Sequence, residues 1–407
     1  MNSMATTLSP AQPPWQKLLG TLIVGGAAAA LAGLFLDPRQ FVFSYLLVFM
    51  FFLSVCLGAL FIVILHHLFD AHWSVSIRRF LEHISFLLPV LAVLFIPLAL
   101  LAPRLYVWME PGQVAAEVAE KSRYMNRPFF YLRMVGCFAI WSWLAYKLRY
   151  CSIQQDRTGA AVWTYQMRRW SAAGILLLAF TLTVAAIDWM KGLQPQWFST
   201  MYGVYFFAGS VWVATAFAYV ITVVLRRAGP LRDLAPARLF RDLGVLLLTF
   251  TIFSAYVHFS QYLIIWFGNM PEETFWYVLR ERGSWWNVGL WLVFGHFLAP
   301  FLILLRTDSK TRFWIMIPLA CFIAAMQWLD LSFNIMPALH PEGFQFHWLD
   351  AACFALIGGV LAVCFLRWLY RHPMYPIRDP RLKEFLTIVE VPPPAIAEAM
   401  HQDRPLS

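Results

Sequence analysis

The sequence has little charge, and its few cysteines show no cofactor-binding spacing. Only 13% of the 407 residues are charged, whereas 60% are hydrophobic; soluble globular chains carry roughly 25% charged residues. The six cysteines are scattered, and none falls in the C-x-x-C or C-x-x-C-H pattern used by iron–sulfur clusters and c-type haem. The composition excludes a soluble globular fold, and we expect no metal and no covalently attached cofactor on this chain.

Long apolar runs take the place of polar segments. A helix needs about 20 mostly apolar residues to cross the hydrocarbon core of a bilayer, because it rises about 1.5 Å per residue. The windows of this kind are 18–36, 41–65, 85–102, 128–148, 171–189, 201–225, 243–267, 286–305, 313–333 and 348–370. They are continuously apolar rather than alternating, which favours helices over barrel strands. We therefore predict an all-α polytopic membrane protein with about ten spans in residues 1–370 and a tail at 371–407.

Basic residues are distributed unevenly between the two sides of the membrane. Most of the 31 lysines and arginines lie in the N-terminal tail, in the loops on the same side and in the C-terminal tail. Arg78 and Arg79, for example, fall in the predicted loop of residues 66–84. Because basic residues accumulate in cytoplasmic loops, we expect both termini in the cytoplasm. The same asymmetry accounts for the net charge of +9, so membrane lipids, and not nucleic acid, are the expected partners.

Polar side chains inside the bilayer carry most of the functional information, because burying them there costs free energy. The seventh span is the richest: Ser254, His258, Gln261 and Tyr262 recur at helical spacing and share one face. His258 lies on the order of 14 Å from the periplasmic end of this span, near the middle of the membrane. Three interpretations stay open for it, namely an interhelical hydrogen bond, a proton path or quinone contact, and a haem ligand.

Three further spans carry candidates. Asp330 lies with Gln327 and Asn334 on one face of the ninth span and is either a proton-relay acid or a structural partner. Arg133 in the fourth span needs an anion or backbone carbonyls, and Asp188 and Asp330 are the candidate anions. His296 in the eighth span follows a glycine that allows another helix to approach closely, and only His258 with His296 could ligate a b-type haem.

A polar segment follows the seventh span at the periplasmic edge. It contains Asn269, Glu272 and Glu273, with Pro271 between them. Proline suits the first turn of a helix and carboxylates favour its positive end, so the segment reads as a helix start. The alternative is that these acids dock a periplasmic partner or release protons at this edge.

Several motifs together resemble one bacterial family. The segments are Asp188–Gly203, Phe259–Glu273 and Gly295–Phe301, with weaker agreement in Asn126–Phe130, Arg133 and Gln154–Asp156. They resemble the ActF-type membrane subunit of alternative complex III, a quinol:cytochrome c oxidoreductase. That subunit is similar to NrfD-type membrane anchors, so the resemblance implies two four-helix bundles with two flanking helices. It also implies that the chain lies in a bacterial inner membrane.

The resemblance also implies a role. The chain would not be a catalyst on its own but an integral subunit of a respiratory or photosynthetic electron-transfer complex. Within that complex, this subunit would scaffold the assembly and contribute a proton path or quinone contacts. Iron–sulfur clusters and haem c would belong to periplasmic partner subunits, and the main quinol site to a sister NrfD-like subunit. A secondary transporter and a b-haem membrane anchor are the competing hypotheses.

Overall fold

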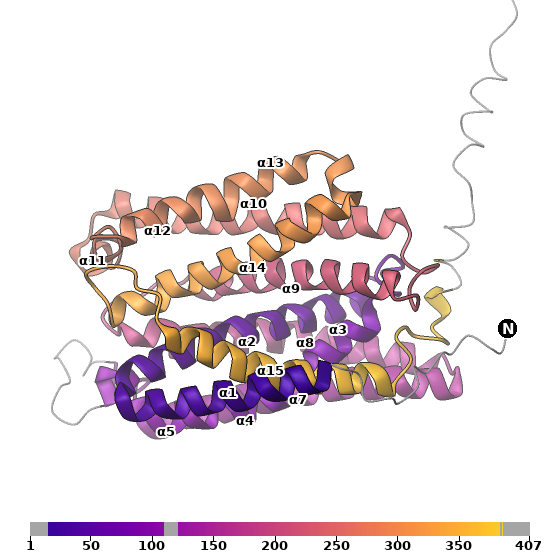
Figure 1. Ribbon diagram of the computed structural model, residues 1–407, viewed down its shortest axis with the longest axis horizontal. Coiled ribbons are helices and arrows are strands. Elements are labelled where there is room, and N and C mark those ends of the chain that lie inside the picture. The colour runs from indigo at the N-terminus through magenta and orange to yellow at the C-terminus, as the bar shows by residue number, and fades with distance from the viewer. Residues whose placement is uncertain (1–14, 110–120, 383–384, 386–407) are drawn as a thin grey trace, which may run out of the picture.

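Helices make up almost the whole of the computed structural model, which describes residues 15–109, 121–382 and 385. Nine helical segments in these residues are long and apolar enough to cross a membrane, and a bent pair makes a tenth. They run side by side along the long axis of the molecule (Figure 1). No strand occurs in these ranges. The chain is an all-α polytopic membrane protein, which confirms the prediction from the apolar windows.

The spans follow the predicted windows in order. They are α1 (Trp15–Leu36), α2 (Pro38–Leu68), the series α3 (Arg78–Ser85), α4 (Leu88–Leu94) and α5 (Ile96–Leu105), α7 (Arg127–Thr158), α8 (Val162–Ala185), α9 (Tyr202–Arg227), α10 (Ala237–Gly268), α12 (Trp285–Trp291) with α13 (Ala299–Leu305), α14 (Phe313–Ile335) and α15 (Trp348–Arg371). Two π-helical segments, η2 (Ala186–Met190) and η4 (Leu292–Leu298), lie within spans. The remaining short elements are α11 (Pro271–Arg280), η1 (Val107–Met109), η3 (Lys191–Leu193), η5 (Asp308–Thr311) and η6 (Met336–Ala338).

Local sequence chemistry explains several helix ends. Asp37 accepts a hydrogen bond from the Gln40 amide at 3.0 Å and so caps α2, whose first residue is proline. Asn126 caps α7 in the same way, through the amide of Phe129 at 2.9 Å. At its other end α7 stops at Gly159, whose φ of +70° is a left-handed conformation that glycine adopts without steric cost.

The third span is bent, which its apolar window did not reveal. Its two halves, Arg78–Leu94 and Ile96–Leu105, meet at an angle of 56°. Pro89 and Pro97 lie in the first turns of α4 and α5. A proline lacks the amide proton for the helical hydrogen bond and clashes with the preceding turn, so each proline interrupts the helix before it.

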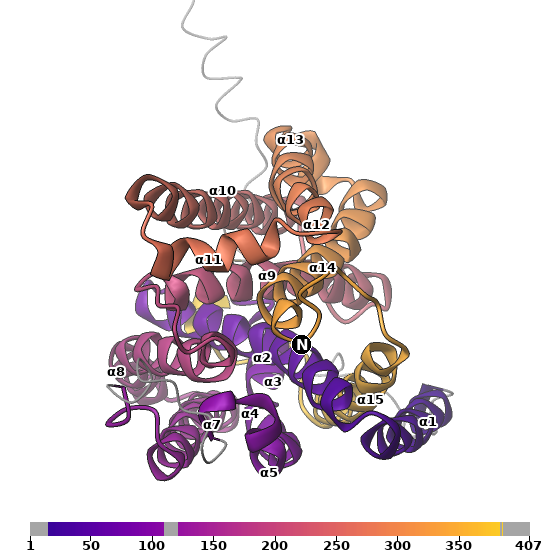
Figure 2. The ribbon, with the colours of Figure 1, turned by 90° about the vertical axis from the view of Figure 1, so that its left-hand side faces the viewer.

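The spans form two groups of four. The first bundle contains α2, the α3–α5 span, α7 and α8; the second contains α9, α10, the α12–α13 span and α14. Helices α1 and α15 pack on each other beside both bundles (Figure 2). The bundles meet where α2 packs on α9, and Gly58 makes this approach possible. A Cβ atom at Gly58 would lie 2.1 Å from the Ser210 carbonyl oxygen.

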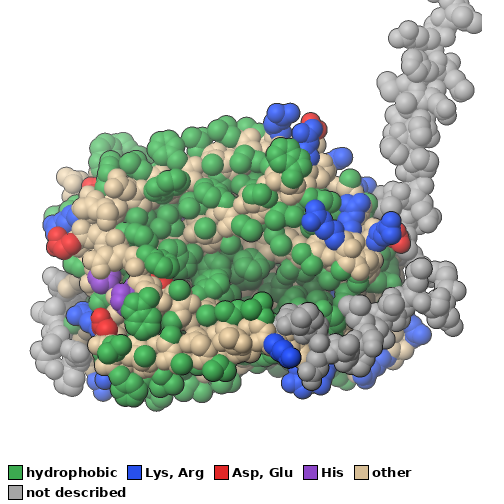
Figure 3. Space-filling model, viewed as in Figure 1, with side chains coloured by type: hydrophobic (Ala, Val, Ile, Leu, Met, Phe, Trp, Pro, Cys, Tyr) green, Lys and Arg blue, Asp and Glu red, His purple; other side chains and the backbone are tan. Residues whose placement is uncertain are grey.

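Charge separates the two ends of the molecule. We call the end formed by residues 69–77, 159–161, 228–236, 306–312, 372–382 and 385 the basic end. Lysine and arginine side chains gather mainly there, while apolar side chains cover the long face between the ends (Figure 3). Residues 372–382 run from α15 across the basic end. The part of the predicted tail beyond residue 385 lies outside the described residues.

Candidate functional site

A cavity of about 700 Å³ lies in the second bundle, between α10, α11, α12 and η4. Nine of its twenty lining residues are phenylalanine, tryptophan or tyrosine, among them Tyr256, Phe259, Tyr262, Trp276, Trp286 and Phe297. Tyr256, Phe259 and Val293 are more than half exposed, so the cavity is open at the surface of the bundle. The lining residues of α10 and η4 belong to candidate membrane spans.

Polar groups from three spans meet at the inner wall of the cavity. His258 of α10 places Nε2 at 3.2 Å from Asp330 Oδ1 of α14. Tyr205 of α9 donates its hydroxyl proton to the same carboxylate oxygen. Asn334 lies one turn after Asp330 and donates to the Tyr205 hydroxyl at 2.8 Å, and its Oδ1 accepts from Tyr202 at 3.1 Å. Asp330 is 2% exposed, so these donors replace water around its carboxyl group.

The hydrogen bonds of His258 define where its protons lie. Nδ1 is 2.6 Å from the Ser254 carbonyl oxygen, which can only accept, so Nδ1 carries a proton. Nε2 then meets Asp330 in one of two forms, imidazolium with carboxylate or imidazole with carboxylic acid. In both forms the pair has no net charge and shares one transferable proton. Release of the shared proton leaves imidazole and carboxylate, with one negative charge, and a proton taken up from a molecule in the cavity then restores the pair without net charge.

His296 stands next to this pair. Its ring centre is 5.4 Å from that of His258 and 4.0 Å from that of Trp212. It is 3% exposed and lines the cavity, and its Nε2 has no hydrogen-bond partner among the described residues. As the sequence predicted, the neighbouring glycine allows close packing, since a Cβ at Gly295 would lie 2.7 Å from Met326 Sδ of α14.

The geometry favours hydrogen bonding over haem ligation at this site. Both nitrogens of His258 already face partners within the chain, Ser254 and Asp330. A haem iron between His258 and His296 would need a free nitrogen lone pair from each ring. In the ranges that the structure describes, no three histidine, cysteine, aspartate or glutamate side chains gather closely enough to hold a metal ion.

Helix α11 roofs the cavity and is fastened to the second bundle by one arginine. Arg280 is 2% exposed and donates to the carbonyl oxygens of Phe333 and Asn334, at 2.8 and 2.9 Å. These are among the last carbonyls of α14, where a helix dipole favours a cation. The guanidinium also lies over the Trp276 ring, 3.4 Å from its centre. Arg280 therefore holds the end of α11 against the end of α14.

The polar edge predicted after the seventh span takes part in this roof. Asn269 ends α10 with a φ of +45°, and Glu272 and Glu273 lie in the first turn of α11. The helix-start interpretation is confirmed, while docking or proton release at these acids stays a prediction. Gln261 joins α10 to the roof by accepting from Ser199 at 2.8 Å and donating to Tyr277 at 3.1 Å. Tyr262 is partly exposed, lines the cavity and contacts the Tyr277 ring.

Arg133 has found one of its two predicted partners. Its Nε and Nη2 lie 2.5 and 3.1 Å from the carboxylate oxygens of Asp188. Asp330 is not its partner, because that carboxylate belongs to the His258 cluster in the other bundle. Asp188 lies in the π-helical segment η2, and Arg133 also donates to the Tyr124 carbonyl oxygen at 2.9 Å. The pair joins α7 to the end of the α8 span.

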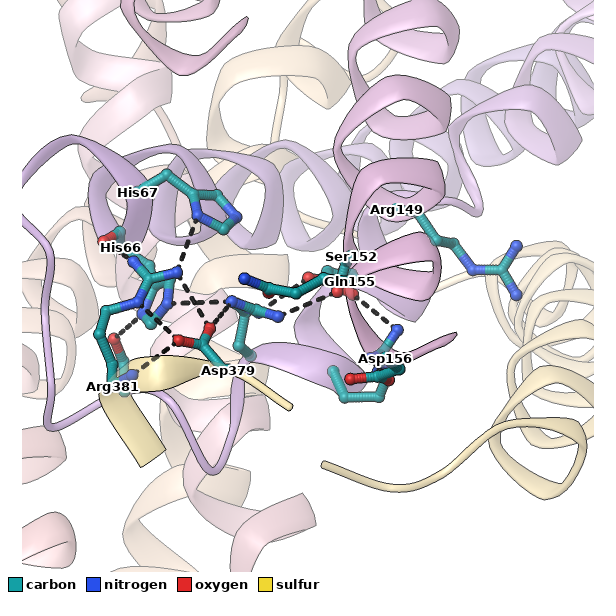
Figure 4. Close-up of polar contacts among 12 residues, drawn as sticks. His66, His67, Arg149, Ser152, Gln155, Asp156, Asp379 and Arg381 are labelled. Atoms are coloured by element: carbon teal, nitrogen blue, oxygen red, sulfur yellow. Dashed lines mark hydrogen bonds and ion pairs between the residues drawn. The ribbon is translucent and has the colours of Figure 1, made fainter. Parts of the chain in front are cut away.

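A second polar cluster lies at the basic end, and sequence analysis missed it. Arg78 and Arg79 were expected in an exposed loop, but they begin α3 and are 1% and 0% exposed. Their charges are balanced by Glu82 on the same helix, by Asp156 of α7 and by Asp379 of the C-terminal segment (Figure 4). The Arg78–Glu82 spacing of four residues is the one local signal in the sequence for such a pairing.

No protein-family model and no curated protein sequence matches the chain. The assignment of a function therefore depends on the geometry of the cavity and on the resemblance of short segments. Those segments converge in space. Phe259–Glu273 and Gly295–Phe301 contribute lining residues to the cavity, and Asp188–Gly203 contributes Ser199, which bonds to Gln261.

Proposed function

We propose that the chain is an integral membrane subunit of a bacterial quinol-oxidising complex, with a quinone-class molecule bound in the cavity of the second bundle. The basic end faces the cytoplasm, since lysine and arginine accumulate on that side of the inner membrane, and both termini lie there. Partner subunits of the alternative complex III type supply the iron–sulfur clusters, the haem c and the sister NrfD-like subunit. The chain scaffolds this assembly and assists quinol chemistry at its own cavity.

The chemistry of the cavity supports this proposal most directly. A quinone is a flat ring with two opposed carbonyl oxygens and an apolar tail. The aromatic lining suits the ring, the opening toward lipid suits the tail, and His296 offers a nitrogen without a partner among the described residues. A volume of about 700 Å³ lies within the roughly 300–1,000 Å³ range of small-molecule pockets.

The His258–Asp330 pair gives the cavity a chemical role beyond binding. Oxidation of a quinol releases two protons and two electrons, and the electrons pass to the redox groups of partner subunits. A hydroxyl group of the quinol needs a base within hydrogen-bond reach to take its proton. Once the pair has released its shared proton, leaving imidazole and carboxylate, Nε2 of His258 can accept a proton from the quinol, which restores the pair without net charge.

Purification and photolabelling of the complex test this function. The full chain would be tagged and isolated from native membranes in mild detergent, and the co-purifying subunits identified by mass spectrometry. An azidoquinone should label peptides of α10 and η4. A His258→Gln variant should lose most of this labelling, whereas Thr249→Val, an exposed position on the same helix, should keep it. Isolation without redox partners, or equal labelling of the two variants, would contradict the proposal.

Secondary transport is a second candidate, since irregular spans surround the cavity. Transporters bind substrates near mid-membrane at interrupted helices, and η4 interrupts the helix that carries His296. A transporter would purify without iron–sulfur and haem c subunits. For the haem-anchor alternative, the optical spectrum of the isolated chain decides, because a bound b-type haem would show a Soret band.

A further inference from the structure

The C-terminal segment after α15 is held by side chains rather than by regular backbone structure. Asp379 is 2% exposed and places its carboxylate between two arginines, Arg78 of α3 and Arg381 of its own segment. Arg381 binds both carboxylate oxygens, at 2.9 and 3.0 Å. Apart from bonds within regular helix, the described residues of this segment form one main-chain hydrogen bond with each other, from the Leu382 amide to the Asp379 carbonyl oxygen.

At the basic end, the segment contacts two helices of the first bundle, α2 and α7. Arg381 donates to the His66 carbonyl oxygen at 3.4 Å and lies 3.5 Å from Asp70, so it contacts the end of α2. On the other side, Asp156 of α7 accepts the amides of Ile377 and Arg378, at 3.0 and 3.4 Å. The labelled side chains in Figure 4 show this arrangement, with Asp379 between the two groups.

A small apolar cluster extends the contact to the second bundle. Leu382 and Phe385 cover Val75, which is 0% exposed, and Leu234 packs against the same group. Val75 belongs to the loop after α2, and Leu234 to the loop between α9 and α10. Its buried members, Val75, Leu382 and Phe385, do not belong to the main core, but Leu234 and Tyr375 pack against both clusters. Opening of the cluster would therefore uncover Val75 while Leu234 keeps its contact with the core.

We infer that residues 375–382, together with Phe385, form a latch across the basic end, which Asp379 holds shut and which opens as a unit. Opening does not leave Arg78 alone, because Glu82 remains 3.0 Å from its Nε. Asp379 and Arg381 also stay together, since they lie on the same segment. Each half keeps a counter-charge, so separation avoids the cost of an unpaired buried ion. An open latch would expose the Arg78 guanidinium, Val75 and Leu234. This inference is independent of the proposed quinone site.

Thiol accessibility measures the state of the latch. A Val75→Cys reporter would be introduced into the full chain. The purified protein would be treated with a maleimide, and the labelling rate of the peptide that contains the reporter would be measured by mass spectrometry. Native Cys56, which is 1% exposed, serves as an internal measure of global unfolding. Asp379→Asn should speed labelling of the reporter on the order of tenfold or more, because it removes one partner of a buried ion pair. Labelling of Cys56 should stay slow.

Matched variants separate the latch from a general change of charge. Asp308→Asn removes an exposed carboxylate at the same end, outside the segment, and should leave the labelling rate unchanged. If Asp379→Asn does not accumulate, Arg381→Gln serves as the opening variant in the same labelling measurement. This variant keeps a counter-charge for Asp379, because Arg78 still binds it. Fast labelling in the parent, or unchanged labelling in the opening variant, would overturn the inference.

Discussion

The ion pair between Arg133 and Asp188 tests how this bundle tolerates charge. The two side chains are 9% and 3% exposed, and Arg133 binds both carboxylate oxygens of Asp188. Arg133→Met keeps an unbranched side chain but removes the cation that binds this buried carboxylate and leaves Lys191 as a nearby positive charge. Loss of one partner from a buried pair costs about 3–5 kcal/mol. The substitution also removes the stacking of the guanidinium on Tyr124, 3.9 Å from the ring centre.

Unfolding in detergent would measure this cost, with two controls. The double variant Arg133→Met/Asp188→Asn should regain most of the lost stability, because a neutral amide needs no cation and replacing both ions is often nearly neutral. Arg104→Met, an exposed arginine on the α5 segment, should cost less than about 1 kcal/mol. A single variant as stable as the parent, or a double variant no better than the single one, would refute the reasoning.

Three further predictions concern packing, roof and latch. Gly58→Ala should destabilise the protein by about 1–3 kcal/mol or more in detergent unfolding, because the added Cβ meets the backbone of α9; Gly136→Ala, with nothing within 4 Å, should be neutral or stabilising. Arg280→Met should cost about 3 kcal/mol in the same measurement by releasing the end of α11 from carbonyls, and an unchanged midpoint would contradict the roof. Burial alone would raise the pKa of Asp379, but Arg78 and Arg381 lower it well below the usual carboxyl range. Its stabilising contribution is then present above about pH 4 and lost as the pH falls further, so the difference in thermal midpoint between the parent and Asp379→Asn should shrink from pH 5 to pH 3; a constant difference would contradict this.

The solvation rule for membranes explains why much of the fold could be predicted. Long apolar windows have to become helices in lipid, because every backbone polar group needs an internal partner. The same rule pointed to the buried polar residues. Arg133 required an anion or backbone carbonyls, and Asp188 was one of the two carboxylates proposed for it. The polar stripe of the seventh span does turn inward at Ser254 and Gln261, which are 0% and 4% exposed.

Contacts between distant segments account for what the sequence could not predict. Tyr205 looks like one more aromatic residue in an apolar span, and nothing local indicates that it bonds to Asp330, which lies 125 residues later. Arg78 and Arg79 read as loop charges, because hydropathy assigns charge to water. Asp379, 301 residues away, supplies a counter-charge that keeps Arg78 out of water. Such pairings depend on the tertiary fold and leave no periodic trace.

The two π-helical segments connect these observations. A π-turn adds one residue to a helical turn and is common at functional sites. In η2 the amide of Lys191 bonds back five residues to Ala186, and in η4 the amide of Ala299 bonds back five residues to Phe294. One segment contains Asp188 and the other His296. Both side chains are buried, with Asp188 5% and His296 3% exposed, and a π-turn shifts the register of the residues that follow it relative to a regular α-helix. Proline and glycine counts do not reveal such a turn, and the sequence therefore made these helices look more regular than they are.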